Sequence, residues 1–300
     1  MGSEMCIRDR LEDNILILAS ILITSHVTWF FYPVALLVIG SRQRALTTLL
    51  HDSAHGVLAK NKSLNWVLGT FCSGYLIFQQ MIPYKKSHCY NHHSHLGNPE
   101  LDPDFKFYIE EGLYYVQSPK DFIVKHIIKP LLLFKVPKYM IYLVKHRLFG
   151  KGCHLYETII MFVYLLTLVI ASVWLGFWDE LILFWLVPYV TVFQVLGYFI
   201  ELSEHYPLVG KNTVDLYMTR NRFSPWYEAF FTSMHGENFH LVHHLMPSLP
   251  FWNLSLAHKF LMADANYSKH NSLTGGIFFS SKNAPSIVSS FSTFEKANKV

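Results

Sequence analysis

Charged residues are scarce in this chain. Only 15% of its 300 residues are Asp, Glu, Lys or Arg, whereas 51% are hydrophobic and 16% are aromatic. A soluble domain usually carries about 25% charged residues. This deficit, together with apolar runs long enough to cross a bilayer, predicts an integral membrane protein. The net charge of +4 is spread over many short segments, which argues against a nucleic-acid-binding surface.

Cysteine is also sparse, and its spacing gives no indication of a disulfide framework. The four cysteines form no CxxC pair: they are Cys6, Cys72, Cys89 and Cys153. The start of the chain resembles neither a signal peptide nor a membrane helix. We therefore interpret residues 1–10 as a cloning remnant or a disordered segment and leave them out of the functional argument.

Long apolar runs lie at the two ends of a more polar middle. They predict four transmembrane helices in two hairpins, over approximately residues 12–24, 27–55, 155–176 and 180–203. Residues 63–82 are apolar too, but a crossing there would place the polar segments on either side of it on opposite faces of the membrane. We expect that segment to lie in the interface or under the polar domain. The lysine-rich residues 119–149 are typical of helices on an anionic membrane surface.

Lysine and arginine are absent from the two short turns that close the hairpins, at residues 24–26 and 176–180. The positive-inside rule then places the other segments and both termini in the cytoplasm. We expect an all-α integral membrane protein with a cytosolic helical cap. Residues 11–262 would form one domain, and residues 263–300 a polar, poorly ordered C-terminal tail.

Histidine, in contrast, is abundant. Eight of the 17 histidines fall in three boxes: HDSAH at 51–55, HCYNHH at 88–93 and HLVHH at 240–244. Imidazoles four residues apart share one face of a helix, and neutral imidazole is the commonest metal ligand. Eight are more than one ion can use, so the boxes predict two metals held between helices in the cap. The eight are His51, His55, His88, His92, His93, His240, His243 and His244.

Two further ligand candidates stand at the end of the fourth predicted span. Glu201 and His205 are four residues apart, and ionisable residues near the end of a span are costly unless they have a function. We expect His205 to be a ninth histidine ligand and Glu201 a carboxylate or water-mediated one. Asp52 and the pair Asp102 and Asp104 could orient ligand imidazoles. That pair could equally form a turn within a loop over residues 96–118.

The ligand type narrows the choice of metal. All-histidine ligation with few carboxylates suits iron, copper or zinc better than magnesium or calcium. A hydrolytic zinc site would be expected to carry an HExxH pattern, which the sequence lacks. A pair of irons could instead reduce O₂ and remove hydrogen from an unactivated C–H bond. A membrane location suits such a centre if its substrate is apolar.

In order and separation, the three boxes resemble the HxxxH, HxxxHH and HxxHH motifs of the membrane fatty acid desaturase family. The similarity covers approximately residues 40–262, including the LDPD run after the second box and the prolines after the third. It implies four transmembrane helices, a cytosolic cap with a non-haem di-iron centre, and O₂-dependent desaturation or hydroxylation. The protein's partners would be membrane lipid and an apolar acyl substrate whose carrier the sequence leaves open. It also implies the nine histidines named above as iron ligands. Because no cytochrome b5-like haem segment is fused to the chain, the electron donor would be separate, either ferredoxin or cytochrome b5.

One departure from the commoner pattern concerns the second box. Three residues rather than two separate its first histidine from the final pair, so Cys89 stands where a two-residue box would place a histidine. Both spacings occur in the family, and we retain His88 as the expected ligand.

The boxes do not distinguish removal of two hydrogens from insertion of oxygen. The HHxHxG and DPD runs also resemble carotenoid hydroxylases and ketolases, so a hydroxylase or ketolase of a carotenoid or another apolar substrate is the alternative. A membrane metal-binding or transport protein is an alternative of another class. It would need histidines along a path through the bilayer, whereas these lie at helix ends on one side.

Overall fold

The protein is helical, as its sequence predicts. The computed structural model describes residues 2–211, 213–281 and 284–294, with side chains from residue 8 to residue 291 within those ranges. No β-strand forms in these residues, where Ser281 and Ala284 make an isolated bridge. Contacts divide the chain into unit 1, residues 1–89 and 138–196, and unit 2, residues 90–137 and 197–300.

Unit 1 contains the first helical hairpin, the larger part of the second hairpin, and the first box. Its helices are α1 (Gly2–His26), α2 (Tyr32–His55), α3 (Lys62–Thr70), α4 (Met81–Lys85), α9 (Leu155–Leu175) and α10 (Trp178–Leu181), with the shorter turns η1 (Trp29–Phe31), η2 (Gly74–Ile77), η7 (Val144–Leu148), η8 (Ile182–Leu186) and η9 (Tyr189–Phe193). Three elements carry the chain from one unit to the other: η3 (Lys86–His92), α8 (Val136–Leu143) and α11 (Gln194–His205).

Unit 2 is built from short helices. They are α5 (Pro103–Glu110), α6 (Pro119–Phe122), α7 (Lys129–Leu131), α12 (Asp215–Met218), α13 (Trp226–Thr232), α14 (His240–Leu245), α15 (Phe251–Leu261), α16 (Ala265–Asn271) and α17 (Ile287–Phe294), with η4 (His93–His95), η5 (Leu113–Tyr115), η6 (Ile123–Ile128) and η10 (Met234–Phe239).

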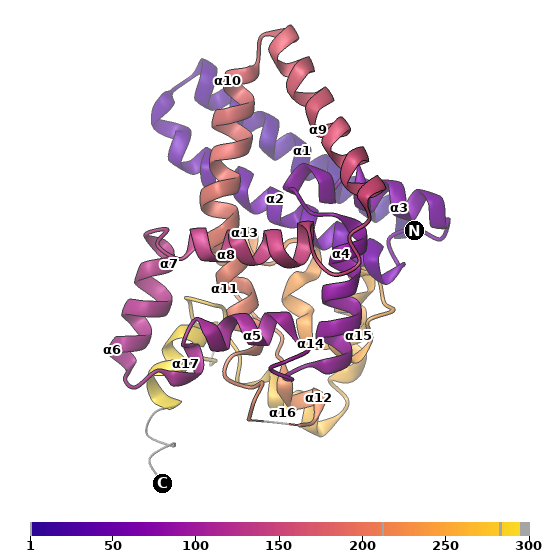
Figure 1. Ribbon diagram of the computed structural model, residues 1–300. Helices are drawn as coiled ribbons and strands as arrows, with labels where there is room; N and C mark the ends of the chain where they lie inside the picture. Colours follow the sequence, from indigo (N-terminus) through magenta and orange to yellow (C-terminus); the bar gives the residue numbers. More distant parts are fainter. Residues whose placement is uncertain (1, 212, 282–283, 295–300) are drawn as a thin grey trace. The chain divides into compact units, whose positions relative to one another are not determined.

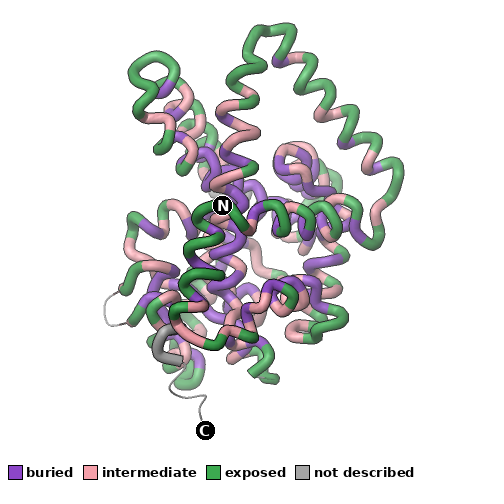
Figure 2. Tube along the Cα trace, turned by 60° about the vertical axis from the view of Figure 1, so that its left-hand side comes forward, coloured by how far each residue is buried: buried purple, intermediate pink, exposed green. Residues whose placement is uncertain are grey.

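Two stretches of the described chain are long and apolar enough to cross a membrane, Leu155–Leu175 and Trp178–His205. They coincide with the last two predicted spans. Helix α9 and the helix that follows it are joined by a tight connection (Figure 1), where Gly176 adopts a left-handed φ of 83°. Most of α9 is exposed (Figure 2), although its sequence is apolar. Contact with lipid would remove this surface from water.

The first hairpin turns where the sequence predicts, although α1 begins about ten residues earlier than expected and α2 begins at Tyr32 rather than near residue 27. Helices α1 and α2 pack against each other, and an ion pair joins Arg42 Nη1 to Asp13 Oδ1 at 3.2 Å. Helix α2 ends at Gly56, which takes a left-handed φ of 79°. Neither α1 nor α2 is among the helices that could span a membrane by length and composition. The structure therefore supports two of the four predicted spans.

The apolar segment 63–82 does not form one long helix, because it breaks into α3, η2 and α4. The Glu157 carboxylate, at the start of α9, accepts the N–H of Met81 at 2.8 Å and so caps α4. The cap and the apolar contacts bury α4 inside unit 1, whereas Leu64 and Val67 of α3 are exposed. The expected placement in the interface or under the polar domain stays a prediction. The cluster that packs α4 against α2 contains Leu50, Ala54, Met81 and Tyr84.

The predicted loop over residues 96–118 is wrong in part, because α5 lies within it. Asp102 is the N-cap of α5: its Oδ1 accepts the N–H groups of Asp104 and Phe105 at 3.1 and 3.2 Å. Pro103 occupies the first helical position, where the missing N–H costs nothing. The Asp-Pro-Asp run is therefore a helix start, although the same residues are also common in turns.

The described residues beyond 262 are not a poorly ordered tail, because they include α16 and α17. The Glu228 carboxylate of α13 accepts the N–H groups of Ile277, Phe278 and Phe279 at 2.6, 3.0 and 2.9 Å. This carboxylate holds the C-terminal segment to α13. Residues 2–10, interpreted above as a remnant or disordered, lie within α1. Their origin as a cloning remnant stays a prediction.

His126 of η6 is a buried histidine outside the boxes. Its side chain has 0% exposure, and its Nδ1 lies 2.9 Å from the Tyr198 hydroxyl. Burial, together with the positive charge of Lys135, lowers the pKa of His126 from 6.5 to about 4. Between these two pH values the unfolded chain binds a proton that the folded chain excludes. The free energy of unfolding therefore falls as the pH drops through this window, by up to about 1.4 kcal/mol per pH unit.

Replacing His126 by Phe should remove this pH dependence. Wild-type protein in detergent should lose more thermal stability between pH 6.5 and pH 4 than the His126→Phe variant does, because only the wild type carries the depressed pKa. The measurement is the unfolding temperature across that range, and the comparison is between slopes rather than absolute values. Parallel slopes would contradict the prediction.

Candidate metal centre

Three of the predicted ligands gather within unit 1. His51 and His55 lie one turn apart at the end of α2, with ring centroids 4.8 Å apart. The His88 ring lies 4.7 Å from that of His51 and 5.5 Å from that of His55. Asp52 Oδ1 lies 3.2 Å from His51 Nδ1, as expected for a carboxylate that orients a ligand imidazole.

The choice of His88 over Cys89 is supported by the surroundings of the thiol. Cys89 packs against the apolar cluster of α2 and α4. Burial raises the pKa of the Cys89 thiol to about 11, so it stays protonated at neutral pH. A thiol binds metals as the thiolate, which makes this side chain a poor ligand.

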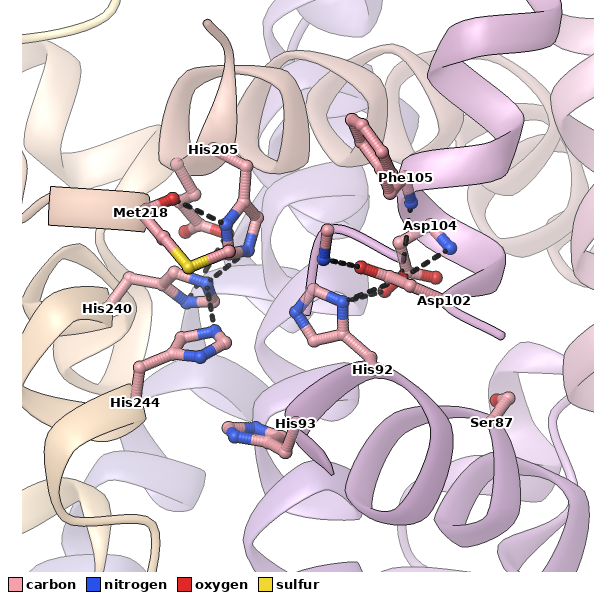
Figure 3. A network of polar contacts seen from close by, with 12 residues as sticks. Ser87, His92, His93, Asp102, Asp104, Phe105, His205, Met218, His240 and His244 are labelled. Atoms are coloured by element: carbon pink, nitrogen blue, oxygen red, sulfur yellow. Dashed lines mark hydrogen bonds and ion pairs between the residues drawn. The ribbon is translucent and has the colours of Figure 1, made fainter. Parts of the chain in front are cut away.

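Four more of the predicted ligands meet within unit 2 (Figure 3). His92 ends η3, His205 ends α11, and His240 and His244 are one turn apart on α14. One ring nitrogen from each lies within 4.8 Å of the others. His240 Nε2 is 2.9 Å from His205 Nε2 and 3.0 Å from His244 Nε2.

The remaining predicted histidines lie beside this group. His93 Nε2 and His243 Nε2 are 2.9 Å apart. The His93 ring also stacks on the His244 ring, with centroids 4.4 Å apart and an interplanar angle of 24°. All six predicted histidines of unit 2 are therefore brought together, although they come from segments more than a hundred residues apart.

Oxygen atoms stand behind three of these imidazoles (Figure 3). Asp102 Oδ1 is 3.0 Å from His92 Nδ1, Glu204 Oε2 is 3.4 Å from His240 Nδ1, and the Met218 carbonyl is 3.4 Å from His205 Nδ1. Because carboxylate and carbonyl oxygens accept hydrogen bonds, each Nδ1 is assigned the ring hydrogen. Each Nε2 is then left with a lone pair that points toward the other histidines.

The distances between the ring nitrogens and the protonation of the rings decide whether these residues fit a metal ion. Two lone pairs facing each other at 2.9 Å, as on His205 and His240, repel each other unless a cation lies between them. Nitrogen ligands bound at right angles at about 2.1 Å from one ion would be about 3 Å apart. Burial and the neighbouring imidazoles lower the pKa values of His240 and His244 well below 6.5, so both are neutral, as ligands must be. The four residues fit a transition-metal ion.

Glu204 is a residue of this centre that sequence reasoning missed. Its second carboxylate oxygen, Oε1, accepts from Arg222 Nη2 at 3.0 Å, and the Arg222 side chain is fully buried. The guanidinium compensates the carboxylate charge in the interior. Glu204 sits beside His205 in sequence, but its partners come from α14 and from residue 222, which no local pattern reveals. Glu201 is not among the four clustered residues, and its ligand role stays a prediction.

Removing the carboxylate behind His92 should weaken metal binding. The Asp102→Ala variant loses both the His92 hydrogen bond and the cap of α5, so its affinity for Fe(II) should fall about 10- to 100-fold. Iron binding by purified protein in the presence of a competing chelator measures this.

Ser118→Ala is the matched control, because Ser118 caps α6 through the N–H of Asp121 at 3.1 Å without touching a predicted ligand. If Asp102→Ala bound Fe(II) as tightly as Ser118→Ala does, Asp102 would act only as the cap of α5, and the prediction would be contradicted.

The chain is similar in sequence to a known protein family and to two known proteins. The sequence model described as "Fatty acid desaturase" matches residues 27–273. The dihydrorhizobitoxine desaturase of Bradyrhizobium elkanii is 40% identical over 274 residues, which cover 89% of this chain and 78% of the relative. The beta-carotene 4-ketolase of Protosiphon botryoides is 25% identical over 239 residues, which cover 78% of this chain and 52% of the relative. The two names correspond to the two reaction types that the boxes left open, and the similarity to the desaturase is the greater.

Proposed function

The chain belongs to the fatty acid desaturase family of oxidoreductases, and from this premise we propose that it is an O₂-dependent, di-iron desaturase. The observation that carries the proposal is the convergence of ring nitrogens of His92, His205, His240 and His244, with oxygen acceptors behind three of them. Such a set can bind a transition metal, and the proposed reaction requires no protein general base.

The proposed iron ligands are the nine predicted histidines, with Glu201 as a further carboxylate or water-mediated ligand. They are His51, His55, His88, His92, His93, His205, His240, His243 and His244. When bound, two irons would supply the reduction of O₂ and the removal of hydrogen from an unactivated C–H bond. Desaturation would then consume O₂, two electrons and two protons for each double bond and release two water molecules.

The chain's own residues have a simpler task, which is to hold neutral imidazoles in one orientation. Asp52, Asp102 and Glu204 accept from, or lie against, the Nδ1 atoms of histidines from each of the three boxes. A buried ligand set that is oriented before the metal arrives loses little entropy when it binds. Three of the rings, those of His88, His92 and His243, are buried, and the others are partly exposed.

We propose a four-span topology with the boxes, the helical cap and both termini in the cytoplasm. The exposed apolar surface of α9 and the absence of Lys and Arg from both hairpin turns support it. A lipid-embedded enzyme of this kind would take an apolar acyl substrate from the membrane. It would receive electrons from a separate ferredoxin or cytochrome b5.

Two other substrates merit direct tests. The printed name of the 40%-identical relative specifies dihydrorhizobitoxine, so desaturation of that compound is the second candidate. The weaker similarity to a ketolase supports oxygen insertion into a carotenoid as the third.

Replacing a histidine of the third box should abolish the activity. The His244→Ala variant loses a ligand nitrogen that lies 3.0 Å from His240 Nε2, so bound iron should fall and product should be undetectable. Iron content and product yield, measured on the same preparation, check this. His154→Ala, which changes an exposed histidine outside the boxes, should behave as wild type. Full turnover by an iron-depleted His244→Ala protein would overturn the proposal.

Product analysis should distinguish the three candidate reactions. A host that expresses the chain and an electron donor is supplied with acyl lipids, dihydrorhizobitoxine or β-carotene, and its extracts are analysed by mass spectrometry. We expect loss of two hydrogens from the acyl lipid. A gain of oxygen on β-carotene would favour the ketolase, and loss of two hydrogens from dihydrorhizobitoxine alone would favour the second candidate.

A further inference from the structure

The helix that carries the third box lacks a cap of its own. Helix α14 has six residues, and the residue before it, Phe239, offers no side-chain acceptor. The N–H groups of Leu241 and Val242 are instead bound by Asn221 Oδ1, at 3.0 and 3.3 Å. A side chain 20 residues upstream therefore satisfies the first turn of this helix.

The other end of the Asn221 amide is held from the C-terminal part of the chain. Asn221 Nδ2 donates to the Tyr267 hydroxyl at 2.8 Å and to Asn271 Oδ1 at 2.7 Å. Both partners belong to α16, and all three side chains are at least 95% buried. Backbone N–H groups can be met only by the amide oxygen, so the orientation of the amide is unambiguous. Both of its hydrogens and both lone pairs of its oxygen are used.

The position of this cap matters for the histidines. Leu241 and Val242 stand between His240 and His243, so the two hydrogen bonds set the rotation of the turn from which the ligands project. A helix of six residues has little stability by itself. The contacts of His240 Nε2, at 2.9 and 3.0 Å, would be lost by a small shift of that turn. External contacts must therefore hold α14 in place.

We propose that Asn221, held by Tyr267 and Asn271, is a positioning residue of the metal centre, and that α16 belongs to this centre rather than to a polar tail. The inference rests on the proposed function in one respect, that the histidines of α14 bind iron. It assigns to residues 265–271 a role in metal affinity that their polar composition does not suggest.

The test compares two asparagine caps. Asn221→Leu preserves size but removes the acceptor for α14, and the affinity for Fe(II) should fall about 10- to 100-fold, as for other groups that orient metal ligands. The matched control is Asn61→Leu, because exposed Asn61 caps α3 through the N–H of Leu64 at 2.9 Å and lies outside all three boxes. That variant should keep the wild-type affinity.

Two further variants distinguish positioning from simple stability. Asn221→Asp retains the acceptor and should recover most of the affinity that Asn221→Leu loses. Asn271→Ala leaves the Asn221 cap intact but releases the amide, and should weaken binding about 3- to 10-fold, less than loss of the cap itself. Chelator competition gives the affinity, the unfolding temperature of each variant is recorded, and the absorption spectrum of the bound metal reports its surroundings.

Each outcome decides the inference. A folded Asn221→Leu protein with wild-type affinity and spectrum overturns it. If that variant does not fold, wild-type affinity in Asn271→Ala overturns it instead. A wild-type protein that binds no iron refutes the proposed function and the inference with it. An iron-binding wild type with an unchanged Asn221→Leu variant refutes the inference alone.

Discussion

The repulsion between ligand nitrogens is the constraint on which the centre depends. His205 and His240, both partly buried, direct their Nε2 atoms at each other at 2.9 Å. Each ring is held in this orientation by an oxygen on its far side, the Met218 carbonyl or the Glu204 carboxylate. With the ring hydrogens on the Nδ1 atoms, a cation bound between the Nε2 atoms would remove this repulsion, as the proposed metal centre requires.

The first box lies on the long helix α2, but the second and third boxes depend on short helices that are capped from elsewhere in their own unit. Glu157 of α9 caps α4, from which the chain continues into the second box. Asn221 caps α14, which carries the third. Short helices have little stability by themselves. Caps from distant segments therefore make the positions of these boxes depend on packing within their own unit.

Much of the fold follows from local patterns. Polar Thr24-Ser25-His26 interrupts an apolar run, and α1 ends at His26 as this predicts. Gly176 ends α9 where a turn is expected. The start of α5 was missed because Asp-Pro-Asp begins both turns and helices, and only contact with the N–H groups of Asp104 and Phe105 separates the two. The helices beyond residue 262 were missed because their stability comes from buried partners such as Glu228.

The sequence by itself determined the family and the helical class and proposed the histidines of the centre, because box spacing and apolar length are properties of short segments. Only the tertiary structure decided which groups hold those histidines. Asp102 lies ten residues from His92, whereas Glu204 and Asn221 act on α14 from 36 and 20 residues away. A buried carboxylate or amide is placed by whichever donors the packing leaves nearby, and no periodicity along the chain encodes that choice.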